Sequence, residues 1–318
     1  PFRGLHPRLL IVDPSGVFCT RVFLYRNVRR ARDGRGERDA ARRFGIIGMM
    51  IIDVHTHVFP DGLAARALAT MEAFAARNGI RAAEQATVSA LRASMQRNGI
   101  AYAVTLPVAT RAEQVASVNR FVIEELRHEP GMLCFGALHP QCAAWEAEIA
   151  RLAAAGIKGV KFHPEFQEFA IDTPAMIPVY RALADAGLLV LFHMGEAYFA
   201  HYRSRGTPAM LVRVLEQVPG LRVIAAHAGA FMRWEEVLAV LAGHPRVWFD
   251  LAYCAGVLPD EMRQRLCAAH GYERVLLGSD FPWVSQDATI AYVRRWGLPA
   301  EQEAGVLGGN AAKLLGIG

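Results

Sequence analysis

The feature that most constrains the fold is a regular alternation of short apolar runs with longer amphipathic stretches after residue 49. Eight apolar runs have the length of strands: 50–54, 101–106, 132–138, 157–162, 188–192, 221–226, 247–251 and 275–277. Helical periodicity marks the stretches that separate or follow them, among them 87–97, 111–127, 145–155, 173–186, 208–217, 234–242, 259–269 and 287–296. Eight strand–helix units with strands too apolar for a one-sided sheet predict a closed parallel (β/α)8 barrel, TIM-like and forming a single domain, rather than an open doubly wound sheet.

Glycines support this rhythm. Gly99, Gly156 and Gly187 each stand one or two residues before a predicted strand, where a helix commonly ends in the left-handed conformation. The sequence contains neither GxGxxG nor GxxxxGK[ST], so it gives no argument for nucleotide binding.

The first 49 residues differ from the rest of the chain. They carry no sustained period of 2 or 3.6, and their eleven arginines against four acidic residues give them a net charge of +7. The whole chain carries +5, so residues 50–318 carry −2. We interpret residues 1–49 as a leader outside the fold, translated upstream of a start at Met49 or Met50; an arginine-rich targeting or anion-binding arm is the alternative. The predicted barrel domain is 50–318.

Composition excludes several classes of protein. No apolar run approaches the 18 residues of a membrane-spanning helix, and the basic character is confined to the leader, so we expect no membrane or nucleic-acid partner. The five cysteines form no CxxC pair and are scattered through apolar segments, which favours buried free thiols and a cytoplasmic location. The sequence is compatible with a homodimer and does not decide the oligomeric state.

Metal-ligating residue types end several of the predicted strands. The first run ends in His55-Thr56-His57, and the two-residue period of a strand points both imidazoles to one side. His193 ends the fifth run, His227 ends the sixth, and Asp280 follows the eighth. The carboxyl ends of all strands meet at one mouth of a closed barrel, so these side chains predict a site for zinc or another divalent ion.

The segments IIDVHTHVFP, GVKFHPEFQ, LLVLFHMGE, VIAAHAG, VLLGSDFPW and LGGNAAKLLG resemble, in order and spacing, the amidohydrolase superfamily over residues 50–318. The resemblance is to its amidohydrolase-related branch (amidohydrolase 2), which also contains metal-dependent decarboxylases. It implies that His55, His57, His193 and Asp280 surround the ion. It also implies that His227 either completes a second metal site or acts on the substrate, so that one or two ions are expected.

Lys161 and His163 share the inward face of the fourth predicted strand. A buried lysine must be carbamylated, deprotonated or paired. Lys161 is therefore a bridging carbamate, a cation that holds a substrate carboxylate, or part of a packing ion pair. His163 either contacts the substrate or makes a structural hydrogen bond.

The function we expect is hydrolysis of an amide, lactone or related carbonyl compound. In this hypothesis Asp280 takes the proton of the attacking water and His227 stabilises the developing oxyanion. Non-oxidative decarboxylation or hydration of an aromatic or unsaturated acid is the alternative within the same fold. A non-catalytic barrel that serves as a binding protein is the alternative from another class.

The small-molecule substrate is not identified by the sequence. The segment 58–85 is long for a connection after a first strand and could form a lid. Tyr198 and Arg203 follow the fifth strand and Arg233 follows the sixth. Aromatic and arginine side chains at a barrel mouth suit a planar carboxylate, and capped, solvated helix ends explain them equally well.

Overall fold

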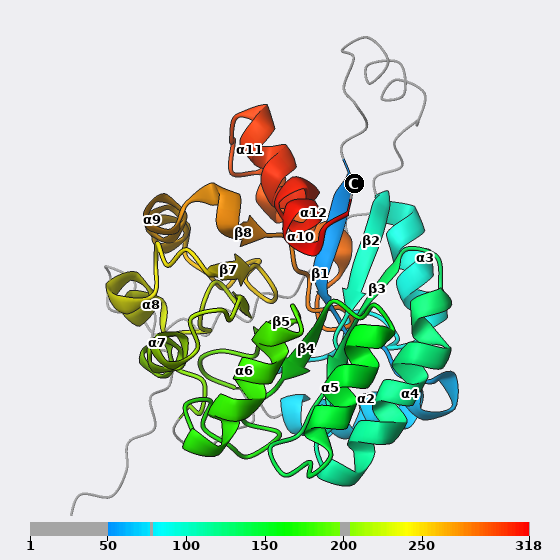
Figure 1. The fold of residues 1–318 in the computed structure, drawn as a ribbon. Coiled ribbons are helices and arrows are strands. Elements are labelled where there is room, and N and C mark those ends of the chain that lie inside the picture. Colours follow the sequence, from blue (N-terminus) through cyan, green and yellow to red (C-terminus); the bar gives the residue numbers. More distant parts are fainter. Residues whose placement is uncertain (1–49, 77–78, 198–203, 318) are drawn as a thin grey trace, which may run out of the picture. The chain divides into compact units, whose positions relative to one another are not determined.

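Eight parallel strands form the centre of the structure, a computed structural model that describes residues 50–76, 79–197 and 204–317 (Figure 1). The strands are β1 (Ile51–Thr56), β2 (Ile100–Thr105), β3 (Met132–Ala137), β4 (Gly159–Phe162), β5 (Leu189–Phe192), β6 (Val223–Ala225), β7 (Val247–Asp250) and β8 (Val275–Leu276). Each strand pairs in parallel with the next one along the chain. The predicted order of strands is confirmed, and the fold is a TIM barrel.

The seam between the last and the first strand is made just beyond β8. The Val54 N–H donates to the Leu277 carbonyl and the Asp280 N–H donates to the His55 carbonyl, both at 2.9 Å. Thr56 also forms an isolated parallel bridge with Phe281. Two predicted metal-ligating residues, His55 and Asp280, therefore lie on opposite sides of the seam that closes the barrel.

Helices surround the strands (Figure 1). They are α2 (Asp61–Ala75), α3 (Val88–Asn98), α4 (Val115–Glu124), α5 (Trp145–Ala154), α6 (Ile177–Asp185), α7 (Pro208–Gln217), α8 (Trp234–Val240), α9 (Asp260–His270), α10 (Gln286–Arg294), α11 (Ala300–Ala304) and α12 (Asn310–Leu315). Local chemistry sets their ends: the Thr87 side chain accepts the Ala90 N–H at the start of α3, and Gly99 ends this helix at φ 65°. Gly156 and Gly187 also take positive φ, as predicted.

Two apolar clusters fill the domain, because side chains of a strand alternate between its faces. On β5, Val190 and Phe192 point outward into the layer between strands and helices, whereas Leu189 and Leu191 point into the barrel. The inner cluster also contains Ile52, Val104, Phe135, Ile224, Leu276 and residues of α12. The C-terminal helix α12 therefore closes the barrel interior.

The structure differs from the expected element bounds in several places, of which three matter most for the site and the closure of the barrel. Strand β1 continues to Thr56, whose carbonyl accepts the Leu106 N–H. The helix expected over 111–127 divides into the 3-10 turns Ala112–Gln114 and Leu126–His128 with α4 between them. The periodicity did not reveal α11 and α12, because they are short and a π-helical turn (Gly305–Gly309) joins them. In that turn Gly308 has no space for a side chain, since a Cβ atom would meet the Met50 carbonyl oxygen.

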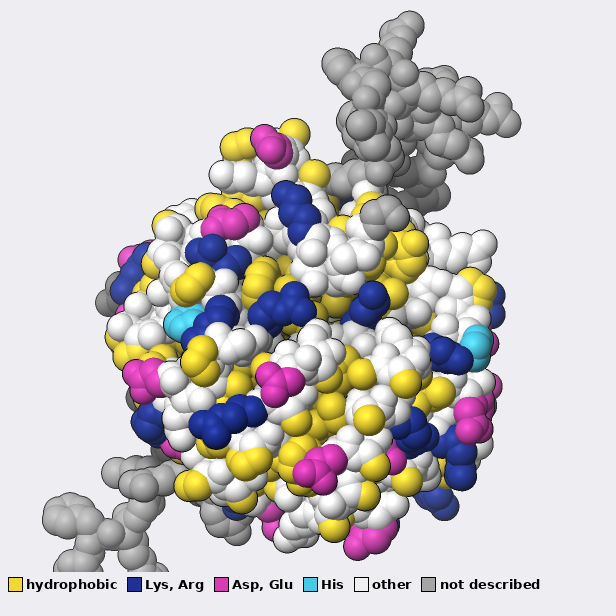
Figure 2. Space-filling view, in the orientation of Figure 1, with side chains coloured by type: hydrophobic (Ala, Val, Ile, Leu, Met, Phe, Trp, Pro, Cys, Tyr) yellow, Lys and Arg dark blue, Asp and Glu magenta, His cyan; other side chains and the backbone are white. Residues whose placement is uncertain are grey.

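The predicted leader, residues 1–49, lies outside the described residues. Within the described part of the chain, no helix is long and apolar enough to span a membrane. On the face shown in Figure 2, basic and acidic side chains are interspersed among apolar ones rather than gathered into a patch of one sign.

Candidate metal centre

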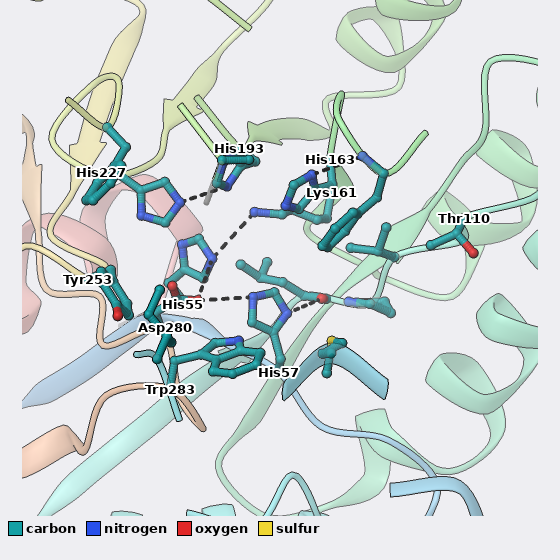
Figure 3. A pocket seen from close by; sticks show the side chains of 18 of the residues that line it. His55, His57, Thr110, Lys161, His163, His193, His227, Tyr253, Asp280 and Trp283 are labelled. Atoms are coloured by element: carbon teal, nitrogen blue, oxygen red, sulfur yellow. Dashed lines mark hydrogen bonds and ion pairs between the residues drawn. The ribbon is translucent and has the colours of Figure 1, made fainter. Parts of the chain in front are cut away.

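Two histidines of β1 and the aspartate after β8 bring three metal-binding atoms together at the carboxyl end of the barrel (Figure 3). The Nε2 atoms of His55 and His57 lie 3.5 and 3.3 Å from Oδ1 of Asp280. One ligand atom from each residue lies within 4.8 Å of the other two. The structure thus groups three of the five strand-end residues that the sequence singled out.

The hydrogen bonds at Nδ1 of His55 and His57 leave Nε2 of each ring facing the site, where Lys161 Nζ lies 3.4 Å from Nε2 of His55. The Nδ1 atom of His57 lies 2.8 Å from the Leu106 carbonyl, which can only accept, so Nδ1 carries the proton. The Nδ1 atom of His55 lies 2.8 Å from a carboxylate oxygen of Asp250. A neutral ring with its proton on Nδ1 presents an unprotonated Nε2 toward Asp280, which is the tautomer that a metal ligand requires.

His193 and His227 form a pair beside this group. The Nδ1 atom of His227 lies 2.8 Å from the Ala252 carbonyl and so carries the proton, and His227 Nε2 accepts from His193 Nδ1 at 2.9 Å. His193 Nε2 is then a buried lone pair, with no hydrogen-bond partner among the described residues. His193 lies outside the three-residue group, and its predicted role as a ligand stays a prediction.

The carboxylate of Asp280 is held in its ionised form. Burial raises its pKa, but the neighbouring His55, His57 and His227 outweigh this and hold the pKa below its ordinary value. Asp280 also has a left-handed backbone at φ 70°, and His227 has one at φ 62°. Such backbone costs about 1–3 kcal/mol for a residue other than glycine and is typical of functional sites.

Lys161 lies on β4, fully inside the barrel. Its Nζ atom is 3.4 Å from Nε2 of His55. Burial lowers the pKa of Lys161 to about 8, although the carboxylates of Asp250, Asp280 and Glu165 oppose this shift. A lysine that loses its proton this readily can be carbamylated or can act as a cation beside an acidic ligand. The bridging carbamate and the substrate cation are both compatible with this position, and the packing ion pair stays a third alternative.

The His163 ring is the middle of a stack of three rings. Its centre lies 4.1 Å from the centre of the His193 ring and 3.9 Å from that of the Phe166 ring. The His163 N–H donates to the side chain of Gln167, which also binds two carbonyls of neighbouring loops. His163 lines the cavity as expected for a substrate contact, and it supports His193 by stacking.

A cavity of about 350 Å³ opens above the three ligand atoms. His55, His57 and Asp280 line it, as do Lys161, His163, His193 and His227. Its other walls are mostly apolar: Val58, Phe59, Met71, Ile80, Leu106, Pro107, Val108, Phe166, Ala197, Phe231, Tyr253 and Trp283. Helix α2 of the expected lid segment contributes Met71 and Thr70. Polar groups at one end of an apolar cavity are typical of a site for a small molecule.

The predicted substrate residues beyond the strands have different positions. Tyr198 and Arg203 lie outside the described residues. The guanidinium of Arg233 is paired with Glu236 at 2.6 Å and with Glu196 at 3.0 Å. Glu196 lines the cavity, but Arg233 is not among the lining residues, so Arg233 reaches the cavity only through Glu196.

Sequence reasoning missed two buried carboxylates beneath the site. Asp250 ends β7 and binds the ring of His55. Asp53 accepts the backbone N–H groups of His55 and Ser279 and the side chains of Ser279 and Gln286. An acidic residue within an apolar strand, as in IIDV and VWFD, was the available signal.

The donor set fits a divalent metal ion. Two imidazoles that direct Nε2 toward the site and one ionised carboxylate are ligands that zinc and similar ions bind, and partners behind both imidazoles fix their orientation. The unpartnered Nε2 of His193 is a further buried lone pair within the same cavity wall. His55, His57 and Asp280 are the residues that would hold the ion.

Solved structures of similar fold include enzymes of two kinds. One is 5-carboxyvanillate decarboxylase LigW from Sphingomonas paucimobilis, with 18% identity, coverage of 85% of this chain and 100% of that chain, and a TM-score of 0.65. A 2,6-dihydroxybenzoate decarboxylase from Rhizobium is 14% identical, with coverage of 84% and 99% and a TM-score of 0.62. A candidate 2-pyrone-4,6-dicarboxylic acid hydrolase from Pseudomonas putida is 19% identical, with coverage of 84% and 98% and a TM-score of 0.61.

At these identities the solved structures establish the fold. No curated protein sequence matches the chain. A protein family described as Amidohydrolase matches residues 52–317, which include every described residue of the candidate metal centre. The chain belongs to the amidohydrolase family.

Proposed function

We propose that this protein is a metal-dependent hydrolase that uses activated water on an amide, lactone or related carbonyl compound, with zinc as the expected ion. The observation that carries the proposal is the grouping of His55 Nε2, His57 Nε2 and an Asp280 oxygen at the polar end of a mostly apolar cavity. A divalent ion in such a site polarises a carbonyl group and lowers the pKa of water.

The chain's own residues would divide the remaining work. Asp280 is ionised, so a carboxylate oxygen can accept the proton of the attacking water and return it to the leaving group. His227 donates from Nδ1 to Ala252, so it can stabilise an oxyanion only when Nε2 is protonated as well. The apolar walls exclude water from the rest of the substrate.

Lys161 and His163 would orient the substrate. Both line the cavity next to the candidate ligands, and Lys161 can meet a substrate carboxylate as a cation. Arg233 would act on a substrate only through Glu196. The substrate contacts of Tyr198 and Arg203 stay predictions, because both lie outside the described residues. The described cysteines, Cys134, Cys142, Cys254 and Cys267, are all free and buried, which supports the predicted cytoplasmic location.

Metal analysis of the purified full-length chain, followed by assays with lactones, amides and aromatic carboxylates, tests the proposal. We expect one or two divalent ions per chain, loss of turnover on chelation and recovery on adding zinc. A chain with full turnover after chelation contradicts the metal-dependent mechanism.

Decarboxylation of an aromatic or unsaturated acid is the second candidate function. The observation in its favour is a buried lysine beside the candidate metal ligands, in a cavity with aromatic walls. Decarboxylases among the structures of similar fold support it. Reaction in ¹⁸O-labelled water separates the two: hydrolysis places the label in the product acid, whereas decarboxylation releases carbon dioxide and leaves no label in the ring product.

A further inference from the structure

Asp250 occupies an unusual position below the site. It is the last residue of β7 and is fully buried, 0% exposed. Within the described part of the chain, its carboxylate bonds to the ring of His55 and to the backbone N–H groups of His227 and Ala252. A buried carboxylate is costly unless its oxygens are fully bonded, and here the donors come from strand β1, from the turn of His227 and from the segment after β7.

One oxygen of Asp250 determines which nitrogen of His55 carries the proton. Oδ2 lies 2.8 Å from Nδ1 of His55. An ionised carboxylate can only accept, so Nδ1 is protonated and Nε2 keeps its lone pair. With the opposite tautomer, His55 would present an N–H to Asp280 and to a metal ion.

The other oxygen holds the turn that carries His227. Oδ1 accepts the backbone N–H of His227 at 2.9 Å and that of Ala252 at 3.1 Å. The Ala252 carbonyl in turn accepts from Nδ1 of His227. His227 and Ala228 both have left-handed backbone, φ 62° and 56°, which needs such bonds to be maintained. The Asp250 carboxylate thus fixes the backbone of His227 directly. It also fixes the orientation of the His227 ring, because it holds Ala252, whose carbonyl binds that ring.

We propose that Asp250 is a positioning residue that sets the tautomer of His55 and fixes the turn of His227, so that one carboxylate prepares both a metal ligand and a reacting side chain. The effect on catalysis rests on the proposed function, whereas the tautomer of His55 and the position of His227 do not. Asp250 is not among the residues that line the cavity. Its bonds reach the cavity through His55 and His227, which do line it.

The substitution Asp250→Asn tests this because an amide has one accepting and one donating end. The amide oxygen can still serve the two backbone N–H groups, so the NH2 group faces Nδ1 of His55 and favours the tautomer with the proton on Nε2. Removing an outer partner of a ligating histidine typically lowers metal affinity 10- to 100-fold. We expect a loss of this size for Zn²⁺ and Co²⁺, measured by titration of the full-length chain.

Asp53→Asn is the matched control. Asp53 is equally buried and also bonds to His55, but to its backbone N–H and not to its ring. Both variants remove a buried negative charge, and both are expected to lower the melting temperature. Only Asp250→Asn should change the ¹⁵N signals of the His55 imidazole, assigned by their absence in His55→Gln.

The ¹⁵N signals of the wild-type protein without added metal give a reading that does not depend on any variant folding. We expect a protonated Nδ1 and an unprotonated Nε2 for His55. The opposite tautomer in the wild type, or unchanged metal affinity and unchanged signals in a folded Asp250→Asn, overturns the proposal. Failure to find any turnover contradicts the proposed function. The ¹⁵N signals and the metal affinities still test the role of Asp250 in that case.

Discussion

Lys161 and Leu191 lie side by side on neighbouring strands inside the barrel, and their burial has opposite effects on its stability. They are register partners on β4 and β5, and both are fully buried. Leu191 belongs to the inner apolar cluster, where burial of a leucine side chain contributes about 1.5–3 kcal/mol. Lys161 instead costs free energy, as its lowered pKa records. A residue that stabilises the barrel and a residue of the candidate active site are therefore direct neighbours on adjacent strands.

The same contrast separates the two ends of the inner space. Toward α12 the interior contains the apolar side chains of the inner cluster. Toward the cavity it contains histidines, a lysine, aspartates and three lining residues other than glycine with left-handed backbone, His227, Tyr253 and Asp280. The comparison teaches that substitutions in the first region should change stability, whereas substitutions in the second should change function and leave stability equal or improved.

The largest expected effect is on turnover. Asp280→Asn keeps an oxygen that can coordinate weakly but removes the proton acceptor, so we expect turnover to fall by about 10² to 10⁴. Metal content and unfolding should change little. The measurements are kcat, metal stoichiometry and chemical unfolding of the same preparation, and wild-type turnover in this variant would rule out the proton-transfer role of Asp280.

Leu191→Ala should show the reverse pattern. The deletion leaves a cavity in the inner cluster, and such changes lower the free energy of unfolding by about 2–5 kcal/mol. Metal content per folded chain should stay at the wild-type level. Urea unfolding with metal analysis of the folded fraction checks this. Loss of metal without loss of stability would show that Leu191 supports the metal site rather than the apolar core.

Lys161→Met sharpens the comparison through its dependence on pH. The folded pKa of about 8 lies below the ordinary 10.5, so between these values the unfolded chain binds the proton and the folded chain does not. Stability of the metal-free wild type should therefore rise from pH 8 to 10.5, by about 3 kcal/mol for this shift. Below pH 8 the full penalty is present, and Lys161→Met should be more stable there. Equal pH profiles of the two proteins would contradict the assigned pKa.

Metal analysis of the same Lys161→Met variant separates the two roles of the lysine. A bridging carbamate predicts a fall from two ions to one or none. A cation for the substrate predicts full metal content with a raised KM for acidic substrates only. Full metal content rules out the carbamate.

The smallest expected effect is that of removing residues 1–49. Their sequence lacks apolar periodicity, so we predict unchanged melting temperature, metal content and turnover for the chain that begins at Met50. Thermal unfolding of the two chains side by side is the measurement. A drop of many degrees would show that the leader belongs to the folded domain.

The sequence predicted the barrel because each strand is an apolar run long enough to be recognised without its neighbours. It predicted His55, His57 and Asp280 because strand ends of a barrel share one mouth. It could not predict that His193 turns its Nδ1 toward His227, since that depends on the Ala252 carbonyl fixing the His227 tautomer. Asp250 was missed because its partners lie 195 and 23 residues away in sequence and only closure of the barrel brings them together.

The seam between β1 and β8 has a consequence for synthesis. His55 is near the start of the folded domain and Asp280 is near its end, and the backbone bond that joins their segments also closes the barrel. During translation the histidine half of the donor set leaves the ribosome more than 200 residues before the carboxylate half. A nascent chain therefore has no complete ligand group to offer a metal ion until this seam has formed, so tight capture of the ion cannot precede closure of the barrel.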